Sequence, residues 1–178
     1  MYRLKRQHWS LMQVQQINQN DRSINLHTRS NKYRKLNIGQ LVKVPPRLIK
    51  RQSSHFIDLD AMGIQMIVGC NGWIWLGLVD KKRPVRSQLA EFQLSSREEV
   101  EEQPFDPDRD QLLAASRLAN AILGLAKLSL PIYKDALLAS VELSIANNVA
   151  ISKMLDLEFL ANVVELEEGR RSKMDTSN

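Results

Sequence analysis

The chain has 178 residues, enough for one large domain or two small ones, and its 43% hydrophobic and 25% charged residues are typical of a soluble globular protein. Its one cysteine, Cys70, excludes an internal disulfide framework and a cysteine-rich metal site. The basic N-terminus carries no signal-peptide pattern, and no window approaches the roughly 18 apolar residues of a membrane span. We therefore expect a soluble intracellular protein.

The first half of the chain is expected to be rich in β-structure. Residues 12–16 alternate between apolar and polar, Asn18 to Asp21 read as a turn, and residues 24–28 alternate again, which predicts a hairpin. A further strand is expected at residues 41–44, where Pro45 and Pro46 end it because proline cannot donate to a strand ladder. Two apolar runs, 64–68 and 73–78, flank an Asn-Gly turn and predict a second hairpin.

The second half is expected to be helical. Residues 79–109 are polar and without periodicity, so we interpret them as a loop insertion. Apolar spacing then predicts a helix capped by Asp110 and ending near Leu128, and another over residues 132–145. A third helix is expected to be capped by Ser152, with a charged, frayed tail after Gly169.

Charge is distributed unevenly behind the formal net charge of +5. No acidic residue occurs between residues 22 and 57, whereas acidic residues gather between residues 98 and 110. A one-sided basic stretch favours a polyanionic partner. A solvated basic face with no partner remains the alternative.

No catalytic constellation emerges from the residues that carry chemistry. The three histidines are scattered, and Cys70 has no sequence cue for an activating partner, which favours a buried thiol. Asp58 and Asp60 are one pair of carboxylates without a second acidic cluster, which is weak support for a metal-dependent nuclease.

The glycine-rich turn at residues 69–72 allows two interpretations. A GxxG loop between two helices clamps the nucleic-acid backbone in KH domains. Here both flanks read as strands, which favours a structural turn in which Asn71 and Gly72 supply positive φ. Trp73 and Trp75 share one strand face, where burial is favoured over base stacking, and Tyr33 between two cations is the better stacking candidate.

Several strings resemble one family, the exosome cap subunits called ribosomal-RNA-processing protein 4. SINLHTRS at residues 23–30, then KY (32–33), KL (35–36) and GQLVKV (39–44), resemble the end of that family's OB-fold barrel. LIKR (48–51) and HF (55–56) resemble its link into a KH-like domain. GIQMIVGCNG (63–72), followed by WIW (73–75), and MLDLEF (154–159) look most like the plant form.

The resemblance implies an α+β fold: a partial OB-fold barrel, containing its C-terminal strands only, followed by a KH-like α/β domain with C-terminal helices. The expected domains are residues 1–44 for the barrel, 45–171 for the KH-like domain with an insertion at 79–109, and 172–178 for a disordered tail. Family members have an N-terminal domain and a complete five-stranded barrel, so the resemblance also implies an N-terminal truncation. Arg34 stands where the family has glycine.

The function implied is that of a non-catalytic, RNA-binding cap subunit in 3′-to-5′ processing and decay of ribosomal and other RNAs. Implied partners are RNA, the RNase-PH-like ring subunits and other cap subunits, without a cofactor, metal or membrane, in the nucleus and nucleolus and also the cytoplasm. Six residues are predicted to contact RNA phosphates, and three to form the structural turn. These are His27, Arg29, Lys32, Lys35, Lys50 and Arg51 for RNA, and Gly69, Asn71 and Gly72 for the turn.

Other functions remain open at this point. A free-standing RNA-binding protein would bind RNA tightly as the isolated chain. A truncated scaffolding fragment would dock on the exosome ring without binding RNA. A nuclease that uses Asp58 and Asp60 is the weakest alternative.

Overall fold

The computed structural model describes residues 11–27, 36, 38–52, 54–79 and 106–175. The chain divides into two compact units, the first comprising Met1–Ile38 and Lys81–Pro104, the second Gly39–Asp80 and Phe105–Asn178. Each unit is described by itself. Of the predicted elements, most of the 79–109 insertion lies outside the described residues.

The first unit contains the predicted N-terminal hairpin. Strands β1 (Gln13–Ile17) and β2 (Ile24–His27) pair antiparallel, with one irregularity in register after Val14. Asp21 holds the turn by accepting hydrogen bonds from the Ser23 backbone N–H and hydroxyl, at 3.0 and 2.8 Å. These bonds lower the pKa of the Asp21 carboxyl. The hairpin prediction is confirmed.

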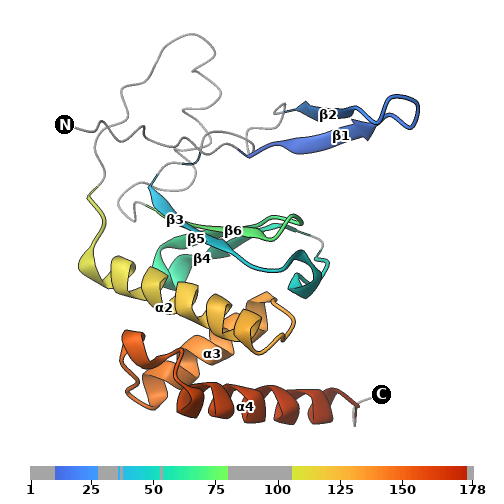
Figure 1. The fold of residues 1–178 in the computed structure, drawn as a ribbon. Helices are drawn as coiled ribbons and strands as arrows, with labels where there is room; N and C mark the ends of the chain where they lie inside the picture. Colours follow the sequence, from blue (N-terminus) through green and yellow to red (C-terminus); the bar gives the residue numbers. More distant parts are fainter. Residues whose placement is uncertain (1–10, 28–35, 37, 53, 80–105, 176–178) are drawn as a thin grey trace, which may run out of the picture. The chain divides into compact units, whose positions relative to one another are not determined.

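A four-stranded antiparallel sheet forms one layer of the second unit (Figure 1). Its order is β3 (Gly39–Lys43), β6 (Trp73–Leu78), β5 (Ile64–Val68) and β4 (Phe56–Leu59). The hairpin of β5 and β6 is confirmed at the predicted residues. Strand β4 was not predicted, because four residues that include an exposed aspartate give too short a pattern. Residues 39–44 fall within the range predicted for the barrel, and in the structure β3 pairs with β6 along its whole length.

Three helices complete the second unit. They are α2 (Arg109–Lys127), α3 (Lys134–Ala146) and α4 (Leu157–Asp175). The prediction of Asp110 as the first cap is wrong, because the N-cap is Asp108, whose backbone N–H donates to the Gln111 side chain at 3.2 Å. The prediction of Ser152 as a cap is also wrong, because it lies in the short 3-10 helix Ile151–Lys153 before α4. Helix α4 extends to Asp175, into the expected tail.

Gln111 is buried at the start of α2 and joins that helix to the sheet. Its side-chain amide donates to the carbonyls of Gly63 and Val79, at 3.1 and 2.9 Å. The Gly63 carbonyl precedes β5 and the Val79 carbonyl follows β6, so the buried amide finds its hydrogen-bond acceptors at the ends of two strands. One side chain therefore fixes where α2 begins relative to β5 and β6.

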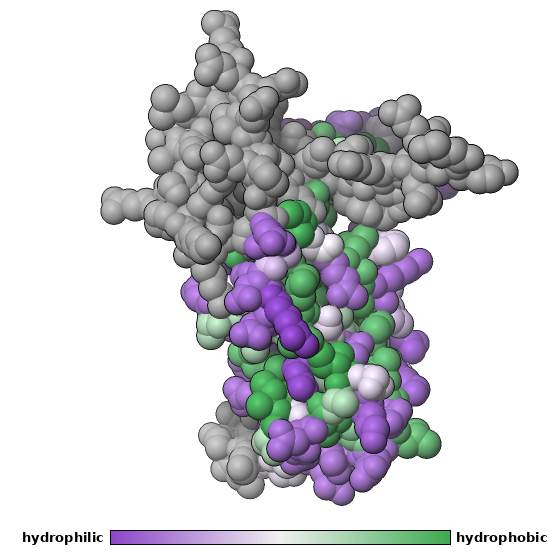
Figure 2. Space-filling model, turned by 90° about the vertical axis from the view of Figure 1, so that its left-hand side faces the viewer, coloured by the Kyte–Doolittle hydropathy of each residue, from purple (hydrophilic) through white to green (hydrophobic). Residues whose placement is uncertain are grey.

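Helix α2 lies between the sheet and the layer of α3 and α4 (Figure 1). The core contains Val42 of β3 and alternate residues of β4, β5 and β6, together with the inward faces of the helices. Ile74 and Leu76 of β6, and Leu118 and Ile122 of α2, are fully buried. On the face of the molecule in Figure 2, apolar side chains alternate with polar ones over the coloured surface. The predicted α+β class is confirmed, whereas the partial barrel stays a prediction.

Candidate nucleic-acid interface

The glycine turn at residues 69–72 joins strand β5 to strand β6. The backbone N–H of Gly69 donates to the Trp73 carbonyl at 2.8 Å, and that of Gly72 donates to the Gly69 carbonyl at 3.1 Å. Asn71 accepts the Trp73 backbone N–H through its side-chain oxygen, at 3.2 Å. In this turn the N–H groups of both glycines are used internally, so neither is available to a phosphate in the manner of a backbone clamp.

Gly72 is required in the turn for two reasons. Its φ is +87°, a conformation that L side chains rarely adopt. A Cβ at this position would also collide with the Val44 carbonyl, which lies beside the turn because the Val44 N–H donates to the Gly72 carbonyl at 2.8 Å. The expected positive φ at Asn71 is wrong, since Asn71 acts through its side chain instead.

Trp73 and Trp75 lie on the sheet face opposite α2, because the residues that alternate with them, Ile74 and Leu76, enter the core. Both tryptophans are half-buried, rather than on the buried face that the sequence analysis favoured. The ring of Trp75 lies over the sheet glycines, where a Cβ at Gly77 would collide with it. Trp75 is therefore occupied by packing within the sheet.

Trp73 has a different neighbour. It pairs across the strands with Lys43, whose ammonium lies 5.2 Å from the centre of the Trp73 ring. The contact of an ammonium with an aromatic ring contributes about 0.5–1 kcal/mol at exposed sites and more where the pair is desolvated.

Exposed basic side chains continue along the chain from this strand end. Lys43, Arg47, Lys50 and Arg51 are all exposed, in a segment without an acidic residue. Of the predicted phosphate contacts, Lys50 and Arg51 belong to this group, and His27 lies on the hairpin of the first unit. Arg29, Lys32 and Lys35 lie outside the described residues, as does Tyr33.

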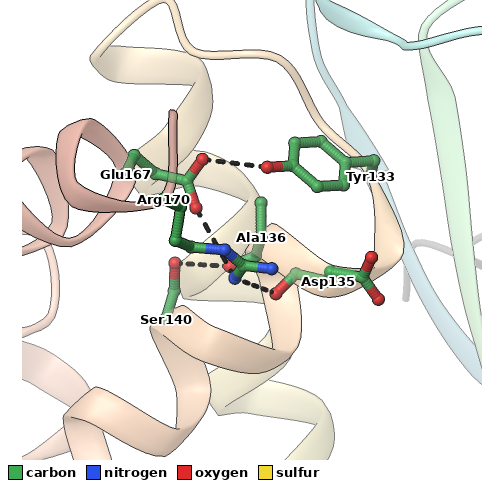
Figure 3. Close-up of polar contacts among 6 residues, drawn as sticks. All are labelled: Tyr133, Asp135, Ala136, Ser140, Glu167 and Arg170. Atoms are coloured by element: carbon green, nitrogen blue, oxygen red, sulfur yellow. Dashed lines mark hydrogen bonds and ion pairs between the residues drawn. The ribbon is translucent and has the colours of Figure 1, made fainter. Parts of the chain in front are cut away.

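Lys50 also has a structural neighbour, Tyr133, whose ring centre lies 5.0 Å from its ammonium. The Tyr133 hydroxyl donates to Oε2 of Glu167 on α4 at 3.0 Å (Figure 3). Glu167 is buried, and its Oε1 has no hydrogen bond, although Arg170 lies 3.8 Å away. Burial, and then the bond to Glu167, raise the pKa of Tyr133. Because Lys50 also contacts Tyr133, a substitution of Lys50 would disturb the fold, and a substitution of Arg51 gives a more direct test of RNA contact.

Cys70 is exposed, so the prediction of a buried thiol is wrong. Its Sγ lies 3.6 Å from Nε2 of His55, a neighbour that the distant sequence positions did not reveal. The other ring nitrogen, Nδ1, lies 2.9 Å from the Val68 carbonyl, an oxygen that can only accept, so Nδ1 carries the proton. His55 thereby joins the end of β5 to the glycine turn.

Asp58 and Asp60 belong to different local structures. Asp58 accepts a hydrogen bond from Gln65 at 2.9 Å on the exposed sheet surface, and Asp60 begins the 3-10 helix Asp60–Met62. Across the described ranges, no three His, Cys, Asp or Glu residues gather in a way that could hold a metal ion. Within the same part of the chain, no helix combines the length and apolar character needed to cross a membrane.

Comparison with known proteins connects these features to one group. The sequence model of the KH domain family matches residues 39–82, which contain the whole sheet and the glycine turn. The chain is 38% identical over 156 residues to the exosome complex component RRP4 homolog of Arabidopsis thaliana, covering 86% of this chain and 48% of that protein. It is 33% identical over 149 residues to exosome complex component RRP4 of Bos taurus, covering 81% and 45%.

A shorter match reaches higher identity. The exosome complex component RRP4 homolog of Caenorhabditis elegans is 52% identical over 64 residues, which cover 36% of this chain and 20% of that protein. The chain spans about half the length of the first two of these relatives.

Proposed function

The chain is a homologue of the exosome complex component RRP4 proteins, and from that premise we propose that it acts as a non-catalytic, RNA-binding cap subunit of the RNA exosome. In this role it supports 3′-to-5′ processing and decay of RNA, including maturation of ribosomal RNA. Its partners are the RNase-PH-like ring subunits, other cap subunits and RNA. Its place in the cell is the nucleus and nucleolus, and also the cytoplasm.

The similarity to the plant relative, which extends over 86% of the chain, carries this proposal. The KH-type sheet supports RNA binding through its basic and aromatic strand end, because cations neutralise phosphates and rings stack on bases. The role proposed for the chain is to hold and guide RNA, while the nuclease is carried by another subunit.

Assembly is tested by purifying the tagged chain from a native extract under mild salt, followed by size-exclusion chromatography and mass spectrometry. The proposal predicts co-elution with ring and cap subunits in a complex far larger than 20.4 kDa. A chain that elutes alone or as an aggregate would contradict it. Tight RNA binding by that lone chain would instead support the free-standing RNA-binding protein.

RNA contact is tested in the purified complex with the charge reversal Arg51→Glu. Each phosphate contact that is lost should reduce the slope of log affinity against log salt by about 0.7 for single-stranded RNA. Lys153→Glu is the matched control, because Lys153 is an exposed cation in a different segment, the 3-10 helix before α4. Equal affinity and slope for both variants would remove Arg51 from the interface. If the complex assembles but this chain contributes nothing to its RNA affinity, the result would support the scaffolding fragment.

A further inference from the structure

We infer that Tyr133 is a positioning residue for RNA binding, which holds the Lys50 ammonium in place for contact with a phosphate. The inference rests on the proposed RNA-binding function, with Lys50 as one of its phosphate contacts. All the residues concerned belong to the second unit, in the segment that follows β3, at the start of α3 and in α4.

The backbone of Lys50 is attached to the start of α3. Its N–H donates to the Ile132 carbonyl at 3.3 Å, and the Ile132 N–H donates to the Leu48 carbonyl at 2.7 Å. Ile49 and Ile132 form a parallel bridge between the two segments. Leu48 and Ile132 are both buried, so the bridge lies at the edge of the core. Lys50 is thereby held beside Tyr133, the residue that follows Ile132.

The ring of Tyr133 is fixed at its far end as well. Its hydroxyl donates to Oε2 of Glu167, a buried residue of α4, at 3.0 Å (Figure 3). Arg170, one turn further along α4, donates to the Asp135 carbonyl in the first turn of α3 at 2.8 Å. These two contacts join α4 to the start of α3 on both sides of the ring's attachment. The ring therefore presents a face of fixed orientation.

The Lys50 ammonium lies on that face. Its Nζ is 5.0 Å from the centre of the Tyr133 ring, and Lys50 is exposed. The ring covers one side of the ammonium, which has three N–H donors and can direct others to a phosphate oxygen. A free lysine side chain loses rotamer freedom when it holds a phosphate. The ring has already removed part of that freedom, so a phosphate contact made by Lys50 costs less entropy.

Charge around Lys50 suits the same ligand. Arg47 and Arg51 are exposed cations on either side of it in the sequence, in a segment without an acidic residue. The contact that holds Lys50 is with an uncharged ring, so the ammonium keeps its charge for a phosphate. Tyr133 thus orders one cation of the basic segment without neutralising it.

The test measures binding of the full chain, in its purified complex, to a single-stranded oligouridylate of about 12 nucleotides, within the site sizes of single-strand binders. Tyr133→Leu removes the ring and should weaken binding by about two- to fivefold. The slope of log affinity against log salt should stay unchanged, because Lys50 keeps its charge. Lys50→Gln should instead reduce that slope by about 0.7.

A double variant separates positioning of Lys50 from a general disturbance of the fold. If Tyr133 acts through Lys50, Tyr133→Leu should have little further effect on RNA affinity in the Lys50→Gln background. The Arg51→Gln background is the matched control, because Arg51 is a neighbouring cation of the same segment, and there the full two- to fivefold loss should remain. A structural effect of Tyr133→Leu would be the same in both backgrounds.

Two further variants allow for the loss of stability. Tyr133→Phe keeps the ring and loses the hydroxyl, so it should retain most of the RNA affinity even though it lowers stability. Tyr133→Met provides a second reading if the leucine variant unfolds, because methionine fills irregular space without supplying a ring. Thermal unfolding and co-elution with the other subunits show that each variant, including Lys50→Gln, is folded and assembled at the temperature of the binding assay.

Three outcomes would overturn the inference and leave the proposed function standing. In the first, Tyr133→Leu and Tyr133→Met bind RNA as tightly as the wild type or more tightly. In the second, their loss of affinity is undiminished in the Lys50→Gln background. In the third, Lys50→Gln changes neither affinity nor slope while Arg51→Glu weakens binding. Failure of the wild-type complex to bind RNA overturns the inference together with the RNA part of the proposed function, whereas co-elution still reports on assembly.

Discussion

The β1–β2 hairpin and the β3–β6 sheet are both antiparallel, but the apolar side chains of the hairpin are exposed, whereas those on one face of the sheet are buried. In the hairpin, the cross-strand pairs Val14 with Leu26 and Ile17 with Ile24 are 53–63% exposed. In the sheet, Ile74 and Leu76 are fully buried beneath α2. A two-stranded ribbon is marginal in water without a layer to cover it. Alternation predicts a strand in both regions, but only a covering helix turns it into a core.

The largest effect that would sharpen this comparison is expected from Leu118→Ala. Leu118 is fully buried in the middle of α2, so its removal leaves a cavity between the sheet and the outer helices. The free energy of unfolding should fall by about 2–5 kcal/mol. Leu112→Ala, on the exposed side of the same helix, is the control and should cost little. Equal losses in urea denaturation would show that the core is not where we place it.

The next largest effect is expected from Gly72→Ala. The substitution forces a side chain into φ +87° and against the Val44 carbonyl, at a cost of about 1–3 kcal/mol. Thermal unfolding of the variant measures this cost. Gly169→Ala is the control, because a Cβ there meets no atom within 4 Å and alanine favours a helix. A variant at position 72 as stable as the wild type would mean that the turn can rearrange.

A smaller effect is expected from Tyr133→Phe, which tests the attachment of α4 to the start of α3. Loss of the hydroxyl leaves both oxygens of the buried Glu167 without a hydrogen bond, at a cost of about 1–2 kcal/mol near neutral pH. Chemical denaturation at several pH values provides the measurement.

The same variant makes a prediction about pH. The pKa of Tyr133 is raised above its ordinary value of 10.0, so the folded chain favours the neutral phenol. That contribution to stability is fully present below pH 10 and is lost as the pH rises through the raised pKa. The stability difference between the wild type and Tyr133→Phe should therefore shrink above pH 10. A constant difference would contradict the role of the hydroxyl.

The smallest effect on the stability of the second unit is expected from substitutions in the β1–β2 hairpin. Ile17→Thr replaces a 63% exposed apolar residue and should change the unfolding free energy of the second unit by less than about 0.5 kcal/mol. Hydrogen exchange would measure both regions at once, with faster exchange confined to the hairpin. A cooperative loss of protection across the β3–β6 sheet would erase the distinction between the two regions.

Local signals predicted local structure well. The Asn-Gly turn located both strands of the second hairpin, and apolar spacing located the three helices to within a few residues. The pair Asp108 and Gln111 has the spacing of a capping box and would have located the start of α2. The buried contacts of Gln111 could not be foreseen, because Gly63 and Val79 become its neighbours only after the sheet forms.

The candidate site was predicted less completely than the fold. Charge alone drew attention to Lys50 and Arg51, which the structure leaves exposed. The pairing of Lys43 with Trp73 depends on the register of β3 against β6, and the proximity of Cys70 to His55 depends on the β4–β5 pairing. The spacing of residues in the sequence does not predict the register of either strand pair.

The contacts of Gln111 have one consequence for how this architecture can change. Its side chain donates to the Val79 carbonyl and accepts the Asp108 N–H, so it brings together the points where the chain leaves the sheet and enters α2. Once these ends are fixed, doubling the number of residues between them costs only about 0.6 kcal/mol of closure entropy. The hydrogen bonds of Gln111 therefore anchor the sheet to the first turn of α2 through residues on either side of the segment, and this anchoring does not depend on how many residues lie between 79 and 108.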